Sequence, residues 1–152
     1  KYEFDRLAHS PMIKVKDGNW TLLTKKGDNH YAKLVNTDHF YSLNETTTCV
    51  KNQNGSYDIY ADRQEKYMAR NAAYIIHKKV DFINYIMAKQ MTEQRGGITD
   101  LKWNVYNIQG EKVLKESYDS LDVIAPNAFS FYKNGYRQTV DSTGNYIFVK
   151  AL

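Results

Sequence analysis

The sequence predicts an all-β fold in which tandem antiparallel β-hairpin repeats form an open, twisted array. The first observation is the aromatic content, with 13 Tyr, 6 Phe and 2 Trp among 152 residues, because aromatic side chains suit the pleated surface of a sheet. The second is a set of hairpin dipeptides, such as Asp17-Gly18 and Asn134-Gly135, in which both turn positions need a positive φ. The third is the fourfold recurrence of one ordered set of features at a spacing of about 38 residues.

Each predicted unit begins with a short segment that ends on an aliphatic residue. These four segments are Phe4–Leu7, Phe40–Leu43, Val80–Ile83 and Tyr118–Leu121. An apolar strand that reaches a lysine follows, then a turn, and then a return strand that opens on an aromatic residue. The four opening aromatics are Trp20, Tyr57, Trp103 and Tyr136. The pattern predicts a single repeat domain over residues 1–152, with units at about 1–36, 37–76, 77–114 and 115–152.

The packing of such a chain is expected to depend on contacts between neighbouring hairpins. Each hairpin is too small to bury its own apolar face, so stacking must supply a continuous core. The four opening aromatics are therefore expected at equivalent positions, packed at least in part between units. The same units would also be compatible with a small closed propeller.

A second alternative is an α+β fold with helix at about residues 64–93. This region lies in a stretch, residues 56–95, without Gly or Pro. Within it, four apolar residues follow the i, i+4, i+7, i+11 spacing of a helical stripe. They are Ile76, Val80, Ile83 and Met87. The strand interpretation is preferred because the repeat places Val80–Ile83 in register with the other units.

The C-terminal part of the chain carries the clearest unit pattern. Its elements are the runs Trp103–Leu114, Tyr118–Leu121, Phe129–Tyr136 and Asp141–Gly144. This part resembles the WG-type β-repeats of bacteria, which combine a Gly-Lys-Trp-Gly hairpin, an Asp-x-x-Gly turn and a Tyr-Asp segment. The resemblance is close over residues 101–147 and departs from the family at Thr21 and Asn104, where a glycine would follow the tryptophan. It implies tandem β-hairpins and no catalytic residues.

Composition and charge argue against several classes of partner. The net charge of +4 is spread thinly along the chain, without the basic stripe of a nucleic-acid-binding protein, so nucleic acid is not an expected partner. No apolar run approaches the roughly 20 residues of a membrane helix, so membrane insertion is not expected. The single cysteine, Cys49, rules out an intrachain disulfide and is expected to be a small buried hydrophobe.

The residues that carry chemistry form no recognisable constellation. The four histidines, His9, His30, His39 and His77, lack metal-ligand spacing, so no metal site is expected. There is no glycine-rich phosphate loop, and no cofactor is expected. A nucleophile–base pair would need Cys49 beside His39 or His77, and no motif around Cys49 supports one. We expect a protein that is not an enzyme.

The leading functional hypothesis is a non-catalytic binding module that recognises another macromolecule, with a protein as the expected partner. Tyrosine suits binding surfaces because it offers contact area and a hydroxyl at low entropic cost. The candidate binding residues are Tyr31, Tyr60, Tyr106, Tyr132, Lys14 and Lys16. A glycan or cell-wall binding module is the alternative, and an enzyme with a site built from scattered residues is a third hypothesis. Rings along a groove would favour a glycan, whereas a contiguous apolar patch would favour a protein.

Overall fold

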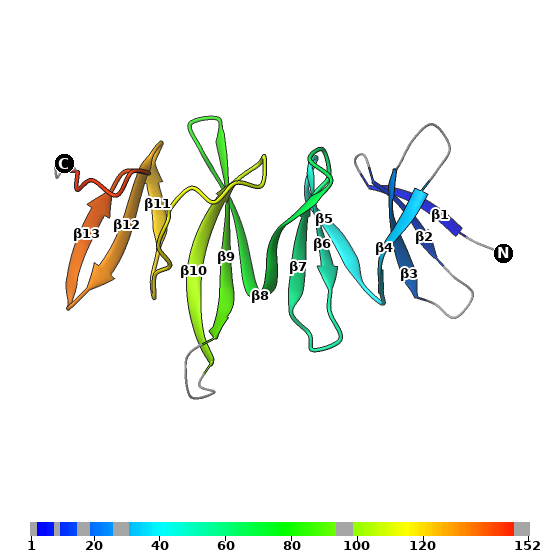
Figure 1. Ribbon diagram of the computed structural model, residues 1–152. Coiled ribbons are helices and arrows are strands. Elements are labelled where there is room, and N and C mark those ends of the chain that lie inside the picture. Colours follow the sequence, from blue (N-terminus) through cyan, green and yellow to red (C-terminus); the bar gives the residue numbers. More distant parts are fainter. Residues whose placement is uncertain (1–2, 8–9, 15–18, 26–30, 94–98, 148–152) are drawn as a thin grey trace. The chain divides into compact units, whose positions relative to one another are not determined.

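The fold is described here from a computed structural model. The part of the chain that it describes comprises residues 3–7, 10–14, 19–25, 31–93 and 99–147. These residues form strands and turns and contain no helix (Figure 1). The strands pair antiparallel and none of the sheets closes into a barrel, so the predicted open all-β fold is confirmed. The chain divides into two compact units, residues 1–71 and residues 72–152.

The first unit contains a four-stranded sheet and part of a six-stranded sheet. The four-stranded sheet is formed in sequence order by β1 (Glu3–Leu7), β2 (Ser10–Lys14), β3 (Trp20–Lys25) and β4 (Tyr31–Thr37). The other strands of this unit are β5 (Phe40–Asn44), β6 (Thr47–Lys51), β7 (Tyr57–Ala61) and the first part of β8 (Lys66–Val80). Leu22, Val50 and Tyr60 form its buried cluster, and Trp20 packs edge-on against Phe40 at 4.9 Å between ring centroids.

The second unit contains the remainder of β8 and five further strands. These are β9 (Ile83–Glu93), β10 (Thr99–Asn107), β11 (Asp122–Ala125), β12 (Ala128–Lys133) and β13 (Tyr136–Val140). The six-stranded sheet has the order β10-β9-β8-β7-β6-β5, so β8 runs through the boundary between the units. The last three strands form a separate sheet in the order β11-β12-β13.

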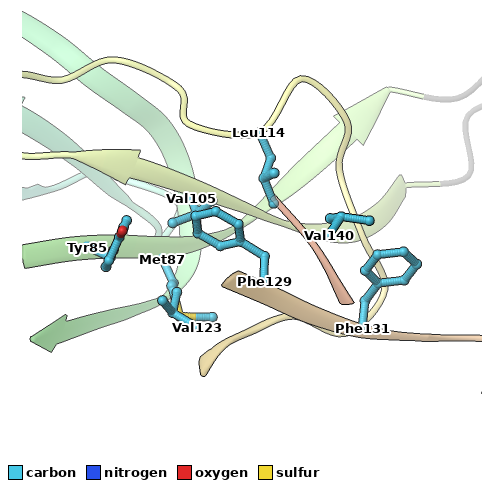
Figure 2. Packing of buried hydrophobic residues seen from close by; sticks show 8 residues of the cluster. All are labelled: Tyr85, Met87, Val105, Leu114, Val123, Phe129, Phe131 and Val140. Carbon is cyan, nitrogen blue, oxygen red and sulfur yellow. The ribbon is translucent and has the colours of Figure 1, made fainter. Parts of the chain in front are cut away.

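The core of the second unit lies between one face of β9 and β10 and the three-stranded sheet. Figure 2 shows the eight buried residues of this cluster, which are Tyr85, Met87, Val105, Leu114, Val123, Phe129, Phe131 and Val140. Phe129 is completely buried, and the ring of Tyr85 packs edge-on against it at 5.6 Å. Burial of this apolar area is the main stabilising contribution to the unit.

The helical alternative for residues 64–93 is wrong, because Lys66–Val80 and Ile83–Glu93 are two strands of one antiparallel hairpin. The register explains why the sequence imitates a helical stripe. Ile76 pairs with Met87, and Val80 pairs with Ile83, so the four apolar residues are symmetric about the turn. Cross-strand partners share one face of a sheet. The apolar spacing that resembles a helical stripe therefore results from the pairing of β8 with β9.

The predicted turns have mixed outcomes. Asn134 and Gly135 both have positive φ and join β12 to β13, as their sequence predicts. Val80–Ile83, which the repeat pattern groups with Tyr118–Leu121, closes a hairpin with two turn residues. Asp17-Gly18 lies outside the described residues.

Three of the four opening aromatics stand at the start of a strand, since β3, β7 and β13 begin at Trp20, Tyr57 and Tyr136. Trp103 instead lies inside β10. Trp20 and Trp103 are partly buried against the two cores. The expectation that Tyr136 packs is wrong, because this residue lies beside a turn on an edge strand and is 74% exposed.

Candidate binding surfaces

Two of the tyrosines predicted to bind a partner are interior residues. Tyr60 belongs to the core of the first unit, and its ring packs against that of Tyr67 at 5.5 Å. Tyr106 is buried in the second unit, where its hydroxyl donates a hydrogen bond of 2.7 Å to the side-chain oxygen of Gln90. Neither residue presents a ring to a partner, because both side chains are buried.

The other predicted binding residues have different positions. Tyr132 lies near the end of β12 and is 62% exposed. Lys14 and Tyr31 belong to β2 and β4, but their side chains are outside the described part of the chain. Lys16 lies wholly outside the described residues.

The residues of the nucleophile–base hypothesis are not arranged for catalysis in the described structure. Cys49 is completely buried, and burial raises the pKa of its thiol to about 12, so the thiol keeps its proton at neutral pH. The ring of His39 packs against Tyr41 and Tyr57, while His77 forms a 2.9 Å hydrogen bond with the side-chain oxygen of Asn84. Among the described residues, no three His, Cys, Asp or Glu side chains gather as a metal site requires.

The turn between β8 and β9 has an unusual composition. Asp81 and Phe82 have φ values of 44° and 68°, so this two-residue turn has both φ angles positive, as in a type I′ hairpin. At the two-residue turn between β12 and β13, in the same unit, Asn134 and Gly135 have φ values of 53° and 79°. Phe82 therefore occupies the position at which the other hairpin has glycine. A bulky side chain in the left-handed region is strained, and the ring of Phe82 offsets none of that strain by burial, because the residue is 90% exposed.

Other exposed apolar residues lie on the same hairpin. Of the large hydrophobic side chains that are exposed in the described structure, Tyr74, Ile76, Phe82, Ile83 and Met91 belong to β8, β9 or their turn. Tyr74 and Ile76 alternate along β8, and Ile83 pairs with Val80 of the same series, so Tyr74, Ile76 and Ile83 share one face, while Phe82 lies in the turn of the same hairpin. We call Tyr74, Ile76, Phe82 and Ile83 the hairpin stripe.

Two lysines each contact one aromatic ring of the hairpin stripe. The ammonium of Lys79 lies 5.7 Å from the centre of the Phe82 ring, and that of Lys89 lies 5.8 Å from the centre of the Tyr74 ring. These contacts fall within the range of cation–π interactions. The surface therefore combines exposed apolar area with positive charge.

The outer strand of this hairpin also has an open edge. The neighbours of β8 in the sheet are β9 and β7. β7 has five residues and joins β8 through residues 62–65, so it pairs only with the first part of the fifteen-residue β8. Among the described strands, none pairs with the outer edge of residues 73–80. An open edge offers unpaired backbone donors and acceptors to another chain.

A groove of about 490 Å³ is the second candidate surface, and it lies entirely within the second unit. It contains Tyr132, together with a second exposed tyrosine, Tyr146, and the partly buried Tyr118. The rings of Tyr118 and Phe131 lie 4.4 Å apart. The groove thus brings together residues that are separated by up to 44 positions along the chain, from Lys102 to Tyr146.

Of the residues at these two candidate surfaces, Tyr132 is predicted from the sequence to bind a partner, and the hairpin stripe and Tyr146 are not. The sequence feature that could have predicted the hairpin stripe is the dipeptide Asp81-Phe82, which lies at the centre of a symmetric pattern of apolar residues. Reading that pattern as a hairpin would have placed Phe82 at a turn position that favours glycine.

Comparisons with known proteins add no assignment. No family model, no curated protein and no solved structure matches this chain significantly. The described residues also contain no helix that is long and apolar enough to span a membrane.

Proposed function

We propose that this chain is a non-catalytic binding module that recognises a protein partner through the hairpin stripe and the open edge of β8. The observation that carries the proposal is the exposed aromatic ring of Phe82, whose backbone occupies a strained turn position. Strained backbone positions cluster at functional sites, and burial does not offset the strain at Phe82. Aromatic residues are also the most frequent anchors of protein interfaces.

The chemistry of the surface indicates the kind of partner. Tyr74, Ile76 and Ile83 add exposed apolar area on the same hairpin as Phe82, and the ammonium groups of Lys79 and Lys89 lie over the Phe82 and Tyr74 rings. A complementary protein surface would offer an apolar pocket for Phe82 and carboxylates for the lysines. An extended segment of that partner would pair with residues 73–80 of β8, since strand addition to an open edge supplies backbone hydrogen bonds.

The proposal is tested by capture with three forms of the chain. The wild type, Phe82→Gly and Tyr136→Gly are immobilised and incubated with lysate of the cells that make the protein. Tyr136→Gly is the matched control, because Tyr136 is an exposed aromatic beside a turn and lies outside the hairpin. A partner that the wild type and Tyr136→Gly retain, and that Phe82→Gly loses at least roughly tenfold, supports the proposal.

Two results would contradict it. If all three forms retained the same proteins equally, the hairpin would not contribute to binding. The second result is that Phe82→Gly no longer sediments with phosphatidylserine vesicles but still captures every protein that the wild type captures. The same surface would then bind an anionic membrane.

A further inference from the structure

The groove of the second unit is separate from the hairpin stripe in its residues. It is lined by β10, by the segment from Leu114 to Asp119, by the end of β12 and by residues 140–146, and it includes none of the stripe residues. Its volume of about 490 Å³ lies within the range of small-ligand sites. It therefore needs an explanation of its own.

The floor and walls of the groove differ in polarity. Leu114, Phe131 and Val140 line it and belong to the buried cluster of Figure 2, so the floor is rigid and apolar. Tyr132 and Tyr146 stand at the groove with exposures of 62% and 64%. A large exposed tyrosine ring combines an apolar face with a hydroxyl that can hydrogen-bond.

The charges along the groove are close to balanced. Three lysines and two acidic residues line it, and Lys102 forms an ion pair with Asp119. The remaining charged groups are Lys115, Lys133 and Glu116. A site for a strongly anionic or cationic ligand would show a clear excess of one charge, so the balance favours an uncharged ligand.

Hydrogen-bonding groups surround the apolar floor. Tyr118 lies deepest among the tyrosines, and burial, with Glu116 and Tyr146 nearby, raises the pKa of its phenol. The phenol therefore stays protonated and able to donate a hydrogen bond. Asp119 and Glu116 supply acceptors, and the hydroxyl of Thr143 is held by a 2.6 Å hydrogen bond to Asp141.

We infer that this groove binds an uncharged oligosaccharide. The C–H face of a sugar ring would stack on the Tyr132 or Tyr146 ring, and its hydroxyls would donate to the carboxylates of Asp119 and Glu116. Such a ligand satisfies the apolar rings, the acceptors and the balanced charge together, whereas a purely apolar ligand would leave the polar groups of the groove unpaired. This binding is independent of the protein partner proposed for the hairpin stripe.

The test titrates the whole chain with cellohexaose, chitohexaose and mannohexaose. Trp103 is a suitable reporter, because its backbone N–H and C=O pair with Tyr118 at 2.7 and 3.0 Å, and Trp20→Phe removes the other tryptophan of the chain. We expect at least one of the three sugars to shift Trp103 emission with a Kd of about 1 mM or below. Tyr132→Ala and Tyr146→Ala should each raise that Kd at least roughly tenfold, and Tyr132→Trp should retain binding.

Two controls separate this site from other surfaces. Tyr136→Ala removes another exposed tyrosine, one that does not line the groove, and Phe82→Gly removes the ring from the hairpin stripe, so both should leave sugar binding unchanged. No response to any of the three sugars at about 10 mM would overturn the inference. It would equally be overturned if Tyr136→Ala weakened binding as much as Tyr132→Ala, or if a heparin hexasaccharide bound more tightly than the neutral sugars.

Discussion

Replacement of Phe82 by glycine separates the stability of the hairpin from its proposed role in binding. Phe82 has φ of 68°, and the left-handed region costs a residue with a side chain roughly 1–2 kcal/mol. Glycine relieves this strain, but it adds about 0.4–1 kcal/mol of conformational entropy to the unfolded chain. The exposed contact with Lys79 at 5.7 Å is also lost, at about 0.5 kcal/mol. The free energy of unfolding should therefore stay constant within about 0.5 kcal/mol or increase slightly.

This outcome differs clearly from that of a packed aromatic. Truncation of a buried Phe destabilises a protein by about 3–5 kcal/mol. Because Phe82 is 90% exposed, no cavity forms when its ring is removed. The reciprocal change, Gly135→Ala, places a side chain at the equivalent turn position, where φ is 79° and a Cβ would meet no atom within 4 Å. It should cost about 1 kcal/mol through backbone strain alone.

Urea denaturation of the Trp20→Phe form measures both changes, since Trp103 packs against the core of the second unit and reports its unfolding. A change in stability appears as a shifted midpoint at constant slope. A loss above about 1 kcal/mol for Phe82→Gly would refute the reasoning, because it would mean that the ring stabilises the fold. A Gly135→Ala variant as stable as the wild type would show that the left-handed turn positions carry little strain.

Four further predictions concern the interior and one turn. Phe129→Ala should lower the free energy of unfolding of the second unit by about 3–5 kcal/mol in the same urea assay, because Phe129 is completely buried in the core. Cys49 should not react with a thiol reagent at pH 8 until the first unit unfolds, because it has no exposed surface. Burial raises the pKa of the Cys49 thiol from 9.0 to about 12. The unfolded state therefore loses this proton first, and the contribution of Cys49 to stability should fall between pH 9 and 12, seen as a steeper decline than in Cys49→Ala. Asp141→Ala should destabilise the turn after β13 and lower the urea midpoint of the second unit, because the carboxylate accepts hydrogen bonds from the backbone N–H groups of Thr143 and Asn145.

The candidate binding surfaces were only partly accessible to prediction. Tyr132, Tyr60 and Tyr106 all occur in strand-like sequence, yet Tyr132 is exposed and the other two are buried. A strand pattern with period two identifies two faces but does not say which face another layer covers. That choice depends on packing between strands that are distant in the chain, and it determines which tyrosines can reach a partner.

The sequence by itself determined the all-β class and the turn at Asn134-Gly135, because aromatic content and positive-φ dipeptides act locally. Only the tertiary structure decided that Val80–Ile83 closes a hairpin, since its apolar pattern fits a helix and a pair of strands equally well. The same holds for the groove, whose walls come from Lys102, Tyr118, Tyr132 and Tyr146. No local propensity brings these residues together, because their proximity results from the packing of β10 and the three-stranded sheet around one core.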